Sequence, residues 1–265
     1  MDIEKIVSQY NENIPLYEGY VVKLSALLKE VLIEQHIDHI IEYRVKDIKH
    51  FEEKISREGK SYTNPLKEMT DICGVRIVVT RTTFVDHIIG ILRSELEIDE
   101  KNSVIKLVEL NIDQFGYLSS HLIVSLNHER TRLTEWKKYV GLQAEIQIRT
   151  QLQHAWAQIS HKFSYKKASD IPTPVQRKLF RLSALFELAD EELETISMNM
   201  EKIYESSVAK ISNGDLSEEL NIDSLKAYIE ESHVVKYWQD IIRNEPQHTV
   251  GSWGDYLGIS ELLIT

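Results

Sequence analysis

The sequence lacks most of the features that mark secreted and membrane proteins. A single cysteine, Cys73, stands among 265 residues, so no disulfide can form within the chain and a cytoplasmic location fits. Cys73 lies in an apolar run and is better explained as a small core residue than as a nucleophile. No apolar stretch approaches the roughly 20 residues that span a bilayer, and the acidic start MDIEKIVSQY is no secretory signal.

Positive charge is also scarce. The chain has 31 lysines and arginines against 42 aspartates and glutamates, which gives a formal net charge of −11. This balance argues against a general nucleic-acid binder, although a local basic patch can exist within an acidic total. Hydrophobic residues at 42% and charged residues at 28% are ordinary for a soluble globular protein. The length suits one large domain, with or without a helical annex.

The stretch from residue 144 to residue 166 is the most informative part of the sequence. Ile146 and Ile148 alternate with polar side chains, which predicts a strand with one apolar and one polar face. The polar face would carry Glu145, Gln147 and Arg149. Thr150 ends the alternation and is a candidate N-cap for a following helix.

The residues after Thr150 repeat with helical spacing in two stripes. The first is apolar and is expected to be buried: Leu152, Ala155, Trp156, Ile159 and Phe163. The second is polar: His154, Gln158, His161, Lys162 and Tyr165. This arrangement places an acid on a rigid strand beside a helix lined with histidine, lysine and tyrosine. A simpler interpretation is a surface ion pair between Glu145 and Arg149, with solvated histidines.

A cluster of cations is expected between residues 43 and 57. An amphipathic helix is predicted there by the apolar spacing of Val45, Ile48, Phe51 and Ile55. Lys46, His50 and Lys54 are four residues apart, so on a helix they would share one face, with Arg44 at its start. Converging cations suit a polyphosphate, whereas a solvated charged face is the alternative.

Two further segments place polar residues on predicted strands. Residues 71–80 are rich in β-branched residues and predict a strand, with Asp71 at its entry and Arg76 projecting from it. An acid at a strand mouth is a metal-ligand position in many phosphoryl-transfer folds, but it can equally cap a turn. In the second segment, Tyr117 starts a strand and His121 follows four residues later. That spacing suits either a base-stacking platform or a simple exposed tyrosine.

Two apolar seams flank this central region. In each seam, apolar residues recur at alternating intervals of four and three residues, as on one face of a helix. The first covers residues 3–31, is expected to be interrupted near Pro15 and Gly19, and would pack on another helix. The second covers residues 175–203 without a break. We expect its first half to pair with the first seam inside the chain, and its second half to contact another subunit or the C-terminal annex.

Five motifs occur in an order and spacing that one family shares. They are Arg44-x-Lys46, Asp71-x-x-Gly74-x-Arg76, Gly116-Tyr117-x-Ser119-x-His121, Glu145-Ile-Gln147-Ile-Arg149-Thr150 and His161-Lys162-x-x-Tyr165-Lys166. Together they resemble the synthetase domain of the RelA/SpoT family over residues 31–193. The resemblance implies a nucleotidyltransferase-like α/β fold, which is a mixed β-sheet flanked by helices, here with a helical C-terminal extension.

The resemblance also implies a reaction. The family transfers the β,γ-pyrophosphate of ATP to the 3′-hydroxyl of GDP or GTP, which gives AMP and the alarmone (p)ppGpp, with Mg²⁺ as cofactor. Converging cations fit this chemistry, because positive charge stabilises phosphoryl groups in the transition state. The chain shows no His-Asp pair of the family's hydrolase domain and lacks the length for the regulatory domains. We therefore expect a small, single-function synthetase.

Individual roles follow from the same resemblance. Asp71 and Glu145 would be catalytic and would hold the metal, with Glu145 activating the 3′-hydroxyl. The ATP-binding residues would be Arg44, Lys46, Lys54 and Arg76. The acceptor-binding residues would be Tyr117, His121, Gln147, Arg149, His161 and Lys166. The chain departs from the family at His50, where a serine is common, and in the middle of GYLSSH, so the acceptor is left open.

Other acceptors and other functions are retained as alternatives. Some small relatives are toxins that pyrophosphorylate the 3′ end of tRNA, and others make the adenosine analogue. A tRNA acceptor would need a basic patch, for which the candidates are Arg130, Arg132, Lys137, Lys138, Lys166 and Lys167. A catalytically inactive module that senses nucleotides or binds a partner is disfavoured, because Asp71 and Glu145 are both present. Small synthetases often form homo-oligomers, and no membrane partner is expected.

We divide the chain into four segments on these grounds. Residues 1–40 are expected to be helical, and residues 41–170 are expected to form the synthetase core. A long helix would follow over residues 171–211, and residues 212–265 would form a small helical annex.

Overall fold

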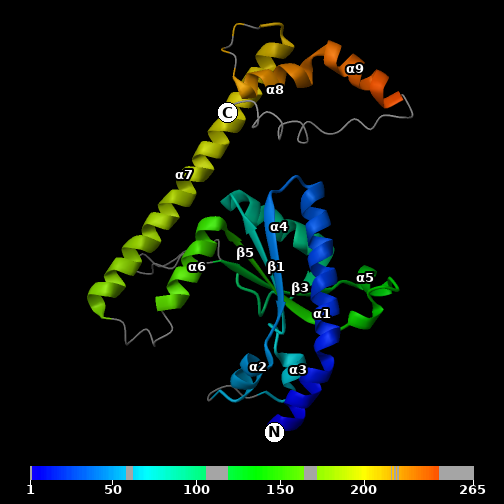
Figure 1. Cartoon of the computed structure of the whole chain (residues 1–265), viewed down its shortest axis with the longest axis vertical. Coiled ribbons are helices and arrows are strands. Elements are labelled where there is room, and N and C mark those ends of the chain that lie inside the picture. The colour runs from blue at the N-terminus through cyan, green and yellow to red at the C-terminus, as the bar shows by residue number, and fades with distance from the viewer. Residues whose placement is uncertain are drawn as a thin grey trace, which may run out of the picture. The chain divides into compact units, whose positions relative to one another are not determined.

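Five strands form one sheet among the residues that the computed structural model describes, which are 2–57, 62–105, 119–163, 172–215, 217, 219 and 221–244 (Figure 1). The strands are β1 (His39–Val45), β2 (Cys73–Val79), β3 (Leu96–Ile98), β4 (Ser120–Leu126) and β5 (Gln143–Thr150). Their order is β1-β2-β5-β4-β3, with β2 and β5 parallel and the other neighbours antiparallel. The predicted mixed sheet flanked by helices is confirmed.

The helices continue into the C-terminal part, as predicted. They are α1 (Ile3–Glu34), α2 (Ile48–Ile55), α3 (Pro65–Glu68), α4 (Thr82–Glu95), α5 (His128–Arg132), the 3-10 helix η1 (Lys137–Tyr139), α6 (Gln151–Phe163), α7 (Thr173–Ser212), α8 (Ile222–Glu231) and α9 (His233–Asn244). In the described part of the chain, none is long and apolar enough to cross a membrane. The chain divides into two compact units, residues 1–194 and 195–265. The four-segment division stays a prediction.

Residue pairing aligns polar side chains across four strands of the sheet. In order from β1 to β4, one row contains Glu42, Arg76, Gln147 and His121. The neighbouring row contains Arg44, Gly74 and Glu145. Successive side chains of a strand point to opposite faces, so Ile146 and Ile148 lie on the other face of β5, where both are fully buried. The alternation predicted for residues 145–149 is confirmed.

Helix α1 is continuous although it contains Pro15, so the interruption predicted near Pro15 and Gly19 is wrong. A proline removes one backbone hydrogen bond, and the buried side chains around it hold the helix together. They are Tyr10, Tyr17 and Tyr20. Gly19 allows close approach, because a Cβ there would lie 2.7 Å from the hydroxyl of Tyr139. The helix packs mainly on β1, β2 and α2 rather than on a second long helix.

The helix predicted for residues 43–57 begins later than expected. Tyr43 to Val45 belong to β1, where they pair with β2, and α2 begins only at Ile48. The side chain of Asp47 caps α2 by accepting a hydrogen bond from the backbone N–H of Lys49 at 2.9 Å. Pairing with a central strand thus overrides the helical periodicity of this segment, and Arg44 projects from a strand.

The apolar seam predicted on α7 is largely exposed. Val175, Leu182 and Leu193 of this seam are 39%, 37% and 45% exposed, whereas Ser183 and Asp190, which do not belong to it, are 2% and 4% exposed. The expected pairing of residues 175–188 with α1 is therefore wrong. The inward side of this part of α7 contains the buried polar residues Ser183 and Asp190, together with Phe186, which packs on Trp156 with ring centroids 5.9 Å apart.

Two acids of α7 bind the ends of the two parallel strands. Asp190 Oδ2 accepts a hydrogen bond of 2.6 Å from the hydroxyl of Thr150, the last residue of β5. Glu194 accepts from Arg81 at 2.9 Å and from the backbone N–H of Thr83 at 3.1 Å, so it caps the first turn of α4. Burial, and then the charge of Glu194, raise the pKa of Asp190 to about 7.

This raised pKa predicts a pH dependence of stability that Asp190→Asn should remove. The folded pKa exceeds the unfolded value of 3.8, so the folded state binds the proton more tightly, and Asp190 costs stability increasingly as pH rises towards about 7. Asparagine still accepts from Thr150 but does not titrate. The melting temperature of Asp190→Asn relative to wild type should therefore rise between about pH 5 and about pH 8. Glu187→Gln, an exposed acid of the same helix, is the control. If the melting temperatures of Asp190→Asn and wild type differed by the same amount at both pH values, the raised pKa of Asp190 would be contradicted.

Candidate functional site

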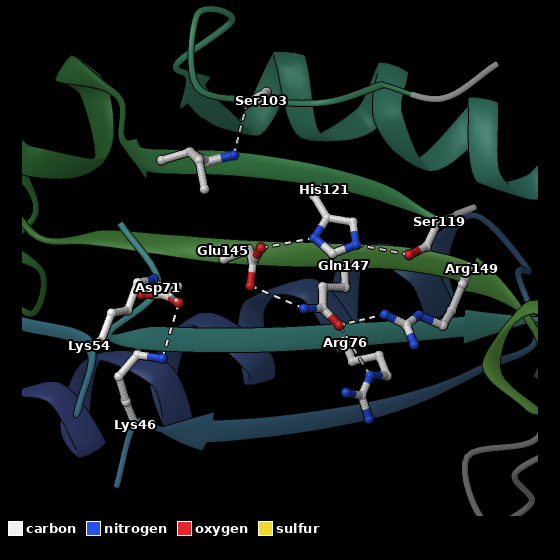
Figure 2. A network of polar contacts seen from close by, with 11 residues as sticks. Lys46, Lys54, Asp71, Arg76, Ser103, Ser119, His121, Glu145, Gln147 and Arg149 are labelled. Carbon is white, nitrogen blue, oxygen red and sulfur yellow. Dashed lines mark hydrogen bonds and ion pairs between the residues drawn. The ribbon is translucent and has the colours of Figure 1, made fainter. Parts of the chain in front are cut away.

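Asp71 is the first acid of the site, and two lysines bind it. It lies two residues before β2, and its Oδ2 contacts Lys46 Nζ at 3.0 Å and Lys54 Nζ at 2.6 Å (Figure 2). Burial favours a raised pKa, but hydrogen bonds from Lys54 and then Lys46 outweigh burial and hold the pKa of Asp71 below its ordinary value. Lys46 comes from the link between β1 and α2, and Lys54 from α2, so the predicted convergence of cations occurs from two elements instead of one helix face.

His50 does not join this convergence. Its side chain is 72% exposed and faces Asp47, with Nδ1 at 3.7 Å from Oδ1. Because the helix starts at Ile48, Lys46 is no longer one turn before His50 on a common face. The three-cation face expected from the sequence is therefore wrong, and the pair Lys46 and Lys54 remains.

Glu145 is the second acid, and both of its oxygens are bound. Oε1 lies 2.9 Å from His121 Nδ1, and Oε2 accepts from Gln147 Nε2 at 3.0 Å (Figure 2). Burial favours a raised pKa here too, but the bonds from His121 and Gln147 outweigh it and lower the pKa of Glu145, against an opposing contribution from the charge of Asp71. The carboxylate is thus the form that its neighbours stabilise.

The two acids lie between two hollows. The first, of about 380 Å³, is lined by Glu42, Arg44, Arg76 and Gln147, and we call it the arginine hollow. The second, of about 330 Å³, is lined by Lys54, Asn102, Ser119 and His121, and we call it the histidine hollow. Asp71 and Glu145 line both. A pair of carboxylates shared by two adjacent hollows can act on a bond that forms between molecules bound in each.

Gly74 keeps the arginine hollow open. It lies between Arg44 and Glu145 in the sheet register. A Cβ on Gly74 would contact Arg44 Cγ at 3.6 Å, an ordinary van der Waals distance. Alanine would therefore fit, but a longer side chain would fill the space between the arginine and the acid.

The junction of β5 and α6 places Arg149 behind this site. Thr150 Oγ1 accepts from the N–H of Gln153 at 3.0 Å, and Gln153 Oε1 accepts from the N–H of Thr150 at 2.9 Å, so the predicted N-cap is confirmed. Arg149 is 6% exposed, and its Nη2 donates to Gln147 Oε1 at 2.6 Å. Burial, and then the charge of Arg76, lower the pKa of Arg149 to about 10.

The remaining predicted site residues divide into two groups. His121 joins the site, whereas His161 is exposed on α6 and lines neither hollow. Tyr117 and Lys166 lie outside the described residues. Sequence reasoning missed Glu42, Ser119 and Asn102 as lining residues. The signal for Glu42 is its place two residues before Arg44, which puts both on the same face of a strand, but the sequence predicts a helix that starts at residue 43.

The acids suit a metal ion that substrate helps to hold. Asp71 Oδ1 is buried with no hydrogen-bond partner. Within the described residues, no cluster of three or more His, Cys, Asp or Glu side chains could hold a metal alone. Mg²⁺ is commonly bound by one or two carboxylates together with substrate phosphates. Asp71 and Glu145 fit that mode of binding.

Comparisons with known proteins find similar sequences. Residues 43–170 match the region found in RelA / SpoT proteins. The GTP pyrophosphokinase YjbM of Bacillus subtilis (strain 168) is 30% identical over 189 residues, which cover 68% of this chain and 84% of that protein. The GTP pyrophosphokinase YwaC of the same strain is 28% identical over 203 residues, which cover 72% of this chain and 92% of that protein.

A solved structure has the same fold. The small alarmone synthetase 1 from Bacillus subtilis, bound to its product pppGpp, superposes with a TM-score of 0.57 and 26% sequence identity. The match covers 72% of this chain and 97% of that one.

The cap at Thr150 yields a stability prediction. Thr150→Val removes the hydroxyl that caps α6 and leaves buried Asp190 without its donor, so unfolding free energy should fall by about 1–3 kcal/mol. Thr150→Ser keeps the hydroxyl and should lose much less. Urea unfolding of both variants measures the difference. Equal losses would mean that packing of the threonine methyl, and not its hydrogen bonds, stabilises the junction.

Proposed function

Because the chain belongs to the RelA/SpoT family and is a pyrophosphokinase, we propose that it transfers the β,γ-pyrophosphate of ATP to the 3′-hydroxyl of GDP or GTP. The 3′-oxygen attacks the β-phosphorus, the bond between that phosphorus and the α,β-bridging oxygen breaks, and AMP leaves with the bridging oxygen. The products are AMP and (p)ppGpp. The observation that carries the proposal is the pair of carboxylates, Asp71 and Glu145, between a hollow with two arginines and a hollow with a histidine.

The arginine hollow suits the donor nucleotide. Arg44 and Arg76 come from neighbouring antiparallel strands on either side of the space that Gly74 leaves open, and guanidinium planes stack on aromatic bases. Lys46 and Lys54 would hold the phosphates, because both already converge on Asp71. Mg²⁺ at Asp71 and Glu145 would neutralise phosphate charge. The arrangement thus supports the predicted ATP-binding set of Arg44, Lys46, Lys54 and Arg76.

The histidine hollow suits the acceptor nucleotide. Glu145 reaches it as a carboxylate with a lowered pKa, and it would accept the proton of the 3′-hydroxyl. His121 lies beside Glu145 and would contact the acceptor. Tyr117 would stack on its base. GDP and GTP are the preferred acceptors, because the two relatives are GTP pyrophosphokinases; an adenosine nucleotide and the 3′ end of tRNA are the alternatives.

One observation weakens the tRNA alternative. A tRNA acceptor would need a basic surface patch, and Arg130 is one of the candidate residues for it. Arg130 is already bound to the side chain and the backbone carbonyl of Glu95. Its ion pair leaves less free positive charge for a phosphate backbone, and phosphate contacts supply most of the affinity for nucleic acid.

The acceptor assay is the direct test. ATP labelled at the γ-phosphate should pass label to GDP or GTP in the presence of Mg²⁺, with AMP formed in equal amount. Label on tRNA or on an adenosine nucleotide, with none on guanosine nucleotides, would replace the acceptor but keep the reaction. Release of labelled inorganic phosphate alone would contradict pyrophosphate transfer.

The same assay tests the two acids. Asp71→Asn and Glu145→Gln should each abolish transfer, because each removes a charge that lies between the hollows. Both side chains face the hollows and not the apolar core, so the melting temperature should stay within a few degrees of wild type. Turnover at the wild-type rate in either variant would show that the acids are not catalytic.

We propose in addition that copies of the chain associate through α7. Leu185 is the centre of an exposed surface, with Leu182 and Leu188 three residues away on either side. Lys178 and Glu192 lie seven residues away on either side, so they share this face of the helix. If two α7 helices pair antiparallel about an axis at Leu185, Lys178 of each copy meets Glu192 of the other, and the contact is self-complementary.

Charge reversal tests this pairing. Lys178→Glu should lower the mass measured by light scattering, because it sets like charges opposite each other twice. Adding Glu192→Lys should restore the mass, since the pairs are rebuilt with reversed sign. Leu185→Glu should dissociate the particle whatever the charges. A monomeric wild type, or a double variant that stays dissociated, would contradict the pairing.

A further inference from the structure

Gln147 occupies the middle of the polar row that crosses the sheet. It lies opposite Arg76 on one side and opposite His121 on the other, two residues after Glu145 on the same face of β5. It lines the arginine hollow, and it is absent from the lining of the histidine hollow among the described residues. Its position is therefore beside the proposed donor rather than the proposed acceptor. Figure 2 shows Gln147 between Glu145 and the two arginines, Arg76 and Arg149.

The bonds of the amide determine which way it points. Its Oε1 accepts from Arg149 Nη2 at 2.6 Å and, more weakly, from Arg76 Nε at 3.4 Å. A guanidinium only donates hydrogen bonds, so the amide oxygen must face the arginines. The amide nitrogen then faces Glu145 and donates to its Oε2 at 3.0 Å.

The arginines are themselves held. Arg76 Nη1 bonds Glu42 at 2.7 Å, directly across from it on β1. Arg149 is buried, so its guanidinium has little freedom to move away from the amide. On the far side of Glu145, His121 binds the other carboxylate oxygen, and the Ser119 hydroxyl lies 2.9 Å from His121 Nε2. A continuous chain of polar contacts thus runs across four strands.

We propose that Gln147 is a positioning residue that aims the carboxylate of Glu145, and that Arg149 acts through Gln147 by fixing the orientation of its amide. This inference rests on the proposed function, because it needs Glu145 to act on the acceptor hydroxyl. It replaces the expectation that Gln147 and Arg149 bind the acceptor.

The physical reason is that a carboxylate held at one oxygen can rotate. With both oxygens bonded, the plane of the Glu145 carboxyl is set by His121 and Gln147 together. A misplacement of about 1 Å in a reacting group can cost about 100-fold in rate. Loss of the Gln147 donor should therefore reduce kcat and leave the binding of the acceptor nearly unchanged, because Gln147 does not line the histidine hollow.

The first part of the test compares two substitutions of Gln147. Gln147→Met keeps the length of the side chain but neither donates nor accepts a comparable bond, and kcat should fall about 10- to 100-fold. Gln147→Glu keeps the acceptor for the arginines but cannot donate to Glu145, so kcat should fall at least as far. In both variants the KM of the acceptor should stay within about two-fold of wild type, because no acceptor contact is lost.

Gln143→Met is the matched control. Gln143 lies on the same face of β5, four residues before Gln147, and lines neither hollow. Its substitution makes the same chemical change on the same strand and should leave kcat and both KM values at wild-type levels.

The second part tests whether Arg149 acts through Gln147. Arg149→Met alone should lower kcat, since the amide loses its shorter bond. In the double variant with Gln147→Met, the loss should equal that of Gln147→Met alone, because residues that act through one another are not additive. Additive losses would mean that Arg149 has a contact of its own with substrate, which overturns its part of the inference.

Three further results would contradict the role of Gln147 or the proposed function. A rise of tenfold or more in acceptor KM with unchanged kcat would mean that Gln147 binds the acceptor, which overturns the inference and leaves the proposed function standing. Melting temperatures that collapse in both Gln147→Met and Gln147→Glu would show a structural role and also overturn it. Absence of pyrophosphate transfer in the wild type would contradict the proposed function itself.

Discussion

The parallel pairing of β2 with β5 is the contact on which the site depends. Its register sets Gly74 opposite Glu145, and Asp71 lies three residues before Gly74. The two acids therefore meet across a pair of central strands, although 74 positions separate them in sequence. Parallel neighbours need a crossover connection, and here the crossover contains the antiparallel strands β3 and β4. One of these, β4, pairs with β5 and brings His121 to the other side of Glu145.

The same register places the far ends of both strands together. Val79 pairs with Thr150, so the starts of α4 and α6 follow from adjacent strand ends. Helix α7 binds this edge with Asp190 on Thr150 and Glu194 on the first turn of α4. A helix start has backbone N–H groups without partners, and an acid from a third helix satisfies them. Helix α7 therefore buries Ser183 and Asp190 and leaves Leu182, Leu185 and Leu188 exposed.

Charge is balanced within the site by ion pairs. Lys46 and Lys54 stabilise the carboxylate of Asp71, while Glu42 pairs with Arg76 at the rim of the arginine hollow. Exposed pairs such as Glu42 with Arg76 contribute little to stability, so they cost little to rearrange. The buried contacts around Gln147 and Arg149 are costly to break, because breaking them leaves buried polar atoms without hydrogen-bond partners.

The local sequence pattern determined the strand and the helix cap at the centre of the site, because each depends only on residues that are close in sequence. The alternation of residues 145–149 predicts a strand because side chains of a strand alternate, and Thr150 caps α6 because a cap needs only the next three residues. The tertiary structure decided what depends on distant partners. Pairing with β2 made residues 43–45 a strand, helix ends at Thr150 and Thr83 selected the buried face of α7, and the register of four strands gave Gln147 its neighbours. The periodicity of a segment cannot reveal such partners. It shows which side chains of the segment share a face, but not which distant residues that face contacts.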